Sequence, residues 1–128
     1  MSHRVSQQFD PDPRQVGDAR RFARAAVEGW GLKADDLELV VGELAANAVL
    51  HARSPYALSL HHDDGLLLVE VSDSNVRYPL VADAPARSLS GRGLGIVARL
   101  ARSWGVRPDG DGKVVWVELP AVEVGVPA

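Results

Sequence analysis

Two neighbouring runs of residues constrain the fold of this chain more than any other feature. The first is YALSLHHD, residues 56–63, and the second is LLLVEVSD, residues 66–73. Both are rich in apolar and β-favouring residues, and they are joined across Asp63, Asp64 and Gly65, where Asp-Gly is a strong signal for a hairpin turn. The two runs therefore predict a pair of antiparallel strands.

Two helices are predicted before this hairpin. Apolar residues recur at helical spacing from Arg14 to Trp30, opposite several arginines, and predict an amphipathic helix over that stretch. A second helix is expected to begin near Asp35, because Asp35 and Glu38 have the spacing of a capping box. It must end before Pro55.

The remaining periodic segments complete the fold prediction. Helical spacing returns from Leu94 to Trp104, the strand KVVWVEL follows the turn PDGDG, and residues 4–9 are a candidate edge strand. The order predicts an α+β fold, a two-layer α/β sandwich with a mixed, mostly antiparallel sheet and helices on one face. At 128 residues the chain is expected to form a single domain over residues 1–128.

The composition excludes several classes of function. The chain has no cysteine, which rules out disulfides and thiolate metal sites, and the formal net charge of −3 comes without a basic run that would favour nucleic acid. No apolar run resembles a signal peptide or is long enough for a membrane helix, so a cytoplasmic protein is expected. A small ligand or another protein is the expected partner.

The stretch GELAANAVLHA, residues 42–52, carries three polar residues on an otherwise apolar helix. Glu43, Asn47 and His51 follow one another at intervals of four and should form one stripe. The stripe has two interpretations. It is either the wet edge of a buried helix, or a site whose carboxylate and amide oxygens suit Mg²⁺ and a phosphate chain. His51 alone is more often a boundary histidine than a ligand.

A second unusual stretch is SGRGLGIVARLA, residues 90–101. Gly91, Gly93 and Gly95 lead into the helical run, and exposed amides at a helix N-terminus can hold phosphates. The spacing matches neither the dinucleotide-binding fingerprint nor a P-loop. Arg92 is either a cation for a terminal phosphate or an ordinary surface arginine.

Four segments in order, ELAANAVLHA, VEVSDS, GRGLGIVARLARSWGV and GKVVWVEL, resemble the ATP-binding domain shared by gyrase, heat-shock chaperones and histidine kinases. That shared domain is known as the GHKL or Bergerat fold. The short form with NAxxHA and GRGL is similar to the anti-sigma-factor serine/threonine kinases common in actinobacteria. The resemblance covers almost the whole chain.

The resemblance implies ATP and Mg²⁺ as cofactors and assigns roles to the residues above. Asn47 would coordinate Mg²⁺, and Glu43 would act as the base or orient the attacking hydroxyl. Asp73 would accept a hydrogen bond from the adenine amino group, a contact that favours adenine over guanine because a carboxylate only accepts. The other implied nucleotide-binding residues are His51, Asn75, Gly91, Arg92, Gly93, Leu94 and Gly95, with Arg77 to Ser90 as a lid.

Two departures from the family pattern predict weaker adenine binding. Members often have a glycine two places after the adenine aspartate, whereas this chain has Asp73-Ser74-Asn75. Asn tolerates a left-handed backbone, which allows the turn to persist. Val114 stands where many relatives have a threonine that helps satisfy the adenine site.

The resemblance also implies partners and an activity. The expected function is an anti-sigma factor that binds a sigma factor and phosphorylates a serine on a STAS-type anti-sigma-factor antagonist. The alternatives are a nucleotide-gated binding module with little or no kinase activity and a scaffold with a degenerate site. Leu39, Val49 and Leu50 on the second helix fit either a homodimer or packing against the first helix.

Overall fold

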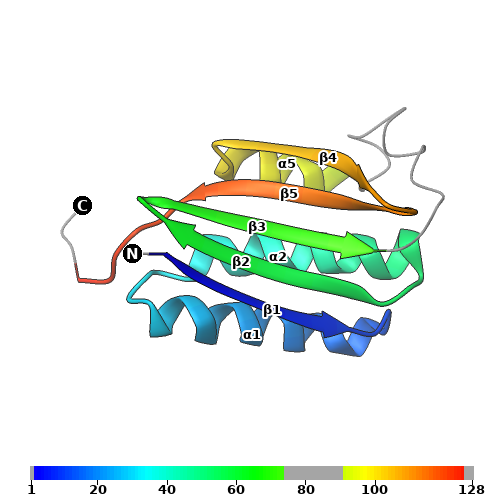
Figure 1. The fold of residues 1–128 in the computed structure, drawn as a ribbon, viewed down its shortest axis with the longest axis horizontal. Helices are drawn as coiled ribbons and strands as arrows, with labels where there is room; N and C mark the ends of the chain where they lie inside the picture. The colour runs from blue at the N-terminus through cyan, green and yellow to red at the C-terminus, as the bar shows by residue number, and fades with distance from the viewer. Residues whose placement is uncertain (1, 74–90, 126–128) are drawn as a thin grey trace.

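The computed structural model describes residues 2–73 and 91–125 (Figure 1). The helical elements are a 3₁₀ turn η1 (Pro13–Gln15), α1 (Val16–Gly29), α2 (Asp35–Asn47), a π-helical turn η2 (Ala48–Ala52) and α5 (Gly91–Leu100). The strands are β1 (His3–Phe9), β2 (Tyr56–Asp63), β3 (Leu66–Asp73), β4 (Ser103–Asp109) and β5 (Gly112–Pro120).

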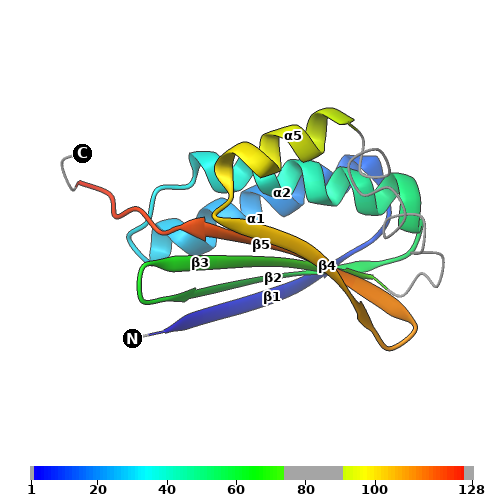
Figure 2. The same ribbon diagram turned by 90° about the horizontal axis from the view of Figure 1, so that it is seen from above.

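The five strands form one sheet in the order β1-β2-β3-β5-β4. The helices lie on one face of this sheet and leave the other face open (Figure 2). This confirms the predicted two-layer α+β sandwich, and β2 and β3 have the predicted bounds. The sheet is not mixed, however, because each neighbouring pair of described strands is antiparallel. The reason is that β2–β3 and β4–β5 are hairpins, and β5 pairs with β3 in the opposite direction.

The hydrophobic core fills the space between the sheet and the helices. Alternate residues of the central strands face it, as period-two spacing requires, and those of β3 are Leu67, Val69 and Val71. Helices α1 and α2 contribute residues at helical spacing, among them Ala23, Val27, Leu37, Val41 and Leu44. Each large apolar side chain buried here contributes about 1.5–3 kcal/mol, so this layer fixes the position of every element near the site.

The start of α2 differs from the predicted capping box. The N-cap residue is Ala34, without a side-chain cap, and Asp35 is already helical. Glu38 instead accepts a hydrogen bond from Arg24 of α1, whose guanidinium also contacts Glu28 at 2.9 Å. This hydrogen bond lowers the pKa of Glu38 below its usual value. The carboxylates of the first turn therefore complement the helix dipole and tie α2 to α1.

Strand β4 was not predicted. The expected helix from Leu94 to Trp104 ends at Leu100, and Trp104 lies in β4, the edge strand opposite β1. The apolar spacing of the helix continues into the strand by coincidence, and Gly105 and Pro108 do not favour a strand. Gly105 has a packing reason, because a Cβ at this position would lie 2.7 Å from Cζ2 of Trp116 on β5. Pro108 is tolerated because edge strands can accommodate proline.

We expect Gly105→Ala to lower the free energy of unfolding by about 1–3 kcal/mol, because Trp116 must move away from the new methyl group. Gly42→Ala in α2 is the matched control. Its Cβ would meet Cδ of Arg20 at 3.3 Å, a flexible side chain that can shift, so the better helix propensity should raise stability by about 0.5–1 kcal/mol. Urea denaturation measures both. Equal stability of the Gly105→Ala variant and the wild type would contradict the packing argument.

Candidate functional site

Three segments singled out by the sequence meet at one end of the molecule. The C-terminal half of α2 with η2, the C-terminal end of β3 and the N-terminus of α5 lie at the same end in both ribbon views (Figures 1 and 2). The first residues of β5 are also here, because Asp73 pairs with Lys113 in the sheet. We take this end as the candidate site.

The two residues of the predicted polar stripe that lie in α2 differ in their surroundings. Asn47, the last residue of α2, is buried, with 8% of its surface exposed. Glu43, one turn earlier, is half-buried and lines an open groove of about 730 Å³ between α1 and α2, which it shares with Arg20 and Leu39. A buried amide requires hydrogen-bonding or metal partners, whereas a carboxylate at a groove can be reached from outside.

The helix changes its geometry after Asn47. Residues Ala48–Ala52 form a π-helical turn, which ends at Arg53 with a left-handed φ of 54°. In a π-turn the backbone hydrogen bonds join residues five apart, whereas in an α-helix they join residues four apart. The interval of four that predicted one polar row therefore holds from Glu43 to Asn47 and not from Asn47 to His51. The side chain of His51 is exposed. Such π-turns occur frequently at functional sites.

Asp73 and Lys113 form a buried ion pair at this end of the sheet. Asp73 is the last residue of β3, and its Oδ2 accepts a hydrogen bond from Nζ of Lys113 at 2.8 Å. The two side chains are 2% and 7% exposed. The sequence reasoning did not identify Lys113. The sequence did contain a signal for it. Lys113 has the two-residue spacing of Val115 and Val117 along the strand, and both valines are buried on the face covered by helices.

The register of β3 and β5 also gives the position of Val114 relative to Asp73. Val114 pairs with Ser72, one position away from the Asp73–Lys113 pair. Because successive side chains of a strand point to opposite faces, Val114 projects to the open face of the sheet, away from Asp73. The side chain beside the carboxylate is therefore that of Lys113, and Val114 does not alter this contact.

Helix α5 begins earlier than predicted, at Gly91. Gly91, Gly93 and Gly95 are therefore part of the helix and do not form a loop before it. The first four amides of a helix have no intrahelical partner and carry a partial positive charge, which suits an anion. Of Arg92 and Leu94 the structure describes only the backbone. Asn75 and the segment from Arg77 to Ser90 lie outside the described residues.

A profile of the histidine kinase-like ATPase domain matches residues 9–119, from the end of β1 to the end of β5. The chain belongs to this family. A search of curated proteins gave no match. Membership in this GHKL superfamily implies ATP binding, and the two-layer architecture agrees with the Bergerat fold. The match includes Asn47, Asp73 and the start of α5.

The donor set of this ATPase domain fits Mg²⁺ bound together with a nucleotide. No group of three or more His, Cys, Asp or Glu side chains that could hold a metal occurs in the described ranges 2–73 and 91–125. Mg²⁺ typically takes one or two protein oxygens and fills its other positions with water and phosphate. The amide of Asn47 is buried in the last residue of α2, and α2 ends at the same end of the molecule at which α5 begins, which is compatible with that arrangement.

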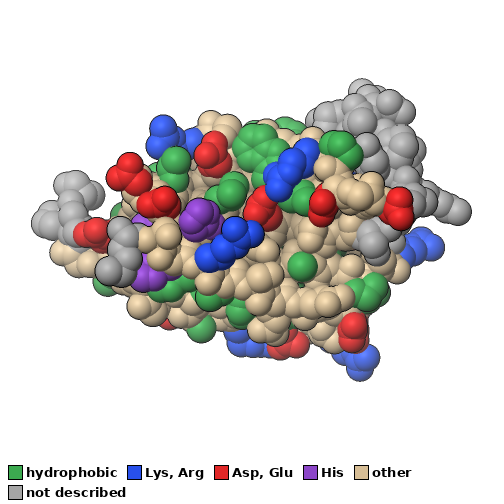
Figure 3. All heavy atoms as spheres, in the orientation of Figure 1, with side chains coloured by type: hydrophobic (Ala, Val, Ile, Leu, Met, Phe, Trp, Pro, Cys, Tyr) green, Lys and Arg blue, Asp and Glu red, His purple; other side chains and the backbone are tan. Residues whose placement is uncertain are grey.

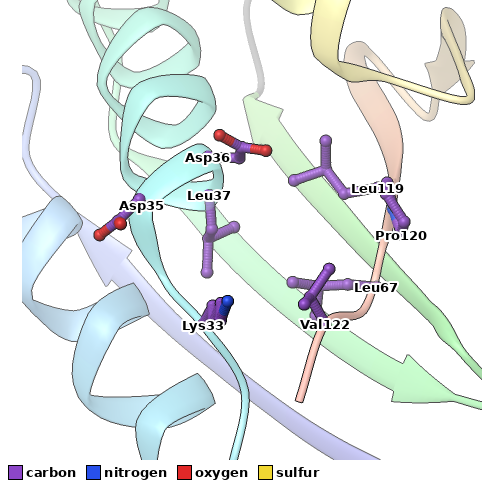
Figure 4. A pocket seen from close by; sticks show the side chains of 8 residues that line it. All are labelled: Lys33, Asp35, Asp36, Leu37, Leu67, Leu119, Pro120 and Val122. Carbon is purple, nitrogen blue, oxygen red and sulfur yellow. The ribbon is translucent and has the colours of Figure 1, made fainter. Parts of the chain in front are cut away.

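Other surfaces of the ATPase domain are less suited to a nucleotide. A hollow of about 150 Å³ lies at the opposite end, where the start of α2 meets the start of β3 and the end of β5 (Figure 4). Its carboxylates, Asp35 and Asp36, would repel phosphates. The open face of the sheet carries intermingled acidic and basic side chains (Figure 3). Arg107 and Glu70, for example, form an ion pair at 2.6 Å. Among the described residues, no helix is long and apolar enough to cross a membrane.

Tyr56 on β2 adds another polar group at the end of the core that holds Asp73. It pairs with Asp73 in the sheet and stacks on Phe9, with ring centroids 5.7 Å apart. Its buried hydroxyl has no hydrogen-bond partner among the described residues. Burial, and secondarily the charge of Asp18, raises the pKa of Tyr56 above its usual value.

Tyr56→Phe is expected to leave stability at pH 7 unchanged or to raise it by up to about 1 kcal/mol, because it removes an unpaired buried hydroxyl. The raised pKa means that the folded protein holds the phenol proton more tightly than the unfolded chain. The contribution of the protonated phenol to the free energy of unfolding is fully present below the unfolded pKa of about 10. It is lost as the pH rises towards the pKa of the folded protein. Denaturation at pH 7 and pH 10.5 should show a smaller alkaline loss for the variant. An equal loss in both proteins would contradict the assignment.

Proposed function

We propose that this ATPase domain is a cytoplasmic serine/threonine kinase that acts as an anti-sigma factor. It would bind Mg-ATP at the end described above, hold a sigma factor, and phosphorylate a serine on a STAS-type antagonist of that interaction. The observation that carries the proposal is the convergence of buried Asn47 and Asp73 with the N-terminus of α5, in a chain of this family.

The residues have distinct roles in this proposal. The amide oxygen of Asn47 would be a Mg²⁺ ligand, and the amides at the start of α5 would hold phosphate oxygens. Mg-ATP would supply the phosphoryl group and the charge that stabilises its transfer. Glu43 would accept the proton of the attacking serine hydroxyl, and its half-buried position in the groove leaves it accessible to a protein substrate.

The nucleotide-binding half is tested by thermal shift with ATP and ADP, each with and without Mg²⁺. At a ligand concentration one hundred times the dissociation constant, binding to the folded state alone adds about 2.7 kcal/mol of stability. We expect this stabilisation with Mg-ATP, and the Asn47→Ala variant should lose most of the part of the thermal shift that depends on Mg²⁺. Asp36→Asn, an exposed change at the far end of α2, is the control and should keep the whole shift. No shift with Mg-ATP in the wild type would refute the proposal.

A second candidate is a nucleotide-gated binding module with little or no phosphoryl transfer. Two observations favour it. The Asp73 carboxylate already binds Lys113, and Glu43 lines the α1–α2 groove whereas Asn47 is buried. Nucleotide-dependent binding of a partner without phosphoserine formation would support the module over the kinase.

A further inference from the structure

We infer that the free edge of β1 pairs with the β1 edge of a second copy of this chain, across a two-fold axis at Ser6. β1 is the outermost strand on its side of the sheet (Figure 1), so such a pairing would join two five-stranded sheets into one. The inference goes beyond the proposed function and does not depend on it, because none of the residues assigned to nucleotide binding takes part in the pairing.

The turn between β2 and β3 determines the direction in which the backbone groups of β2 point. Its two residues, Asp64 and Gly65, have φ values of 50° and 81°, as in a type I′ hairpin. The residues that flank such a turn, here Asp63 and Leu66, form a hydrogen-bonded pair. Hydrogen bonding alternates along an antiparallel strand, so the odd-numbered residues of β2 bond to β3 and the even-numbered residues bond to β1.

This alternation shows which backbone groups of β1 point away from the sheet. The even-numbered residues of β2 pair with the odd-numbered residues of β1, from His3 to Phe9. The N–H and C=O groups of the other residues, Arg4, Ser6 and Gln8, therefore point outward from the edge, and their side chains are exposed. A row of outward N–H and C=O groups is a template for another strand.

The other edge of the sheet, β4, is protected against such pairing. The same alternation across β5 makes Trp104, Val106 and Pro108 the outward residues of β4. Pro108 has no N–H to donate, and a proline on the outward side of an edge strand blocks pairing with another chain. β1 contains no proline, and Arg4 is its single Asp, Glu, Lys or Arg residue. Of the two edges, only β4 therefore has a barrier to pairing.

Helix α1 adds apolar surface next to the β1 edge. Phe22 meets Phe9 with ring centroids 6.0 Å apart, and Trp30 stacks on His3 with centroids 5.2 Å apart, so this flank of α1 lies over β1. Phe22 and Trp30 are only partly buried. Ala25 lies on the same flank by helical spacing and is exposed. A partner strand that continues the sheet, with its own helix above it, would cover this flank.

The outward residues of β1 suit a second copy of the chain as the partner. Antiparallel pairing about an axis at Ser6 places Ser6 opposite Ser6 of the second copy and Arg4 opposite Gln8. Each of the outward residues then belongs to a hydrogen-bonded pair, and no like charges oppose each other. The side chains at the axis are small and uncharged. Such a contact uses the same surface on both copies, so the assembly closes at a dimer.

Sedimentation velocity over a concentration series tests the pairing, and far-UV circular dichroism establishes that each variant is folded. The wild type should form dimers. Ser6→Pro removes the outward N–H at the axis but none of the N–H groups bonded to β2. Because two symmetry-related hydrogen bonds are lost, it should weaken association by about tenfold or more. Ser6→Ala keeps the N–H and is the matched control, with association within about twofold of the wild type.

Two charge variants test the position of the axis. Ser6→Asp and Ser6→Lys each place like charges opposite one another, so each alone should associate about fivefold more weakly than the wild type. An equimolar mixture of the two should instead form a heterodimer, because the opposed charges are then complementary. This reversal follows from a pairing in which Ser6 meets its own copy.

Three results would overturn the inference. A wild type that is monomeric throughout the concentration series would leave the β1 edge for a strand of a different protein. A dimer that Ser6→Pro leaves intact would mean that the copies join through another surface. A mixture of Ser6→Asp and Ser6→Lys that associates no more tightly than either variant alone would remove Ser6 from the axis.

Discussion

Replacing Lys113 by methionine is expected to lower the free energy of unfolding by about 3–5 kcal/mol. Methionine keeps most of the length of the side chain but removes the charge that faces Asp73. The Asp73 side chain is 2% exposed, so water cannot replace the ammonium at 2.8 Å. Removing one partner of a buried ion pair leaves the other charge without that counter-ion, which costs far more than the net contribution of the pair. Urea denaturation at neutral pH measures the loss.

The double variant Asp73→Asn with Lys113→Met separates this explanation from a simple packing defect. With both charges absent, we expect most of the lost stability to return, because buried pairs can be replaced by neutral groups at little cost. Lys33→Met, at an exposed lysine, is the control and should change stability by less than about 0.5 kcal/mol. If the double variant is as unstable as Lys113→Met alone, the loss of that counter-ion is not the cause.

Local sequence patterns predicted the elements that are fixed by their own residues. The hairpin of β2 and β3 has the expected bounds, because alternation and the turn at Gly65, with a φ of 81°, act over short distances. A second helix from near Asp35 to before Pro55 was also predicted, and α2 with the π-turn fills residues 35–52 of it. The π-turn that follows, which removes His51 from the polar row, has no local signal comparable to a glycine or a proline.

The features that were missed depend on contacts between distant residues. Lys113 acquires its partner through the register of β3 and β5, which joins residues 40 positions apart. In the sequence, Gly105 suggests a residue that interrupts a strand. In the structure, Trp116 of the neighbouring strand packs against it. A single sequence shows that each residue is unusual, but which strands pair, and in what register, is decided by the packing of the whole sheet.

Replacing Glu43 by glutamine is expected to slow phosphoryl transfer to a serine of a STAS-type antagonist by about a thousandfold, within the range attributed to a general base. Glutamine keeps the shape of the side chain but cannot accept the hydroxyl proton in the same way. Because Glu43 lines the outer groove and Asn47 is the buried residue of the pair, ATP affinity should change little. Initial rates of phosphoserine formation with labelled ATP measure the first effect, and calorimetry the second.

Glu38→Gln is the matched control, because Glu38 lies on the same helix and lines the same groove. Its carboxylate is held by Arg24, which makes it a structural contact between α1 and α2. We therefore expect a slightly less stable protein with nearly the wild-type transfer rate, since ion pairs that remain partly exposed to solvent contribute little. Equal rates for Glu43→Gln and the wild type would remove Glu43 from the chemistry. An equal loss in both variants would instead indicate that the groove acts by binding the antagonist, as the binding-module alternative requires.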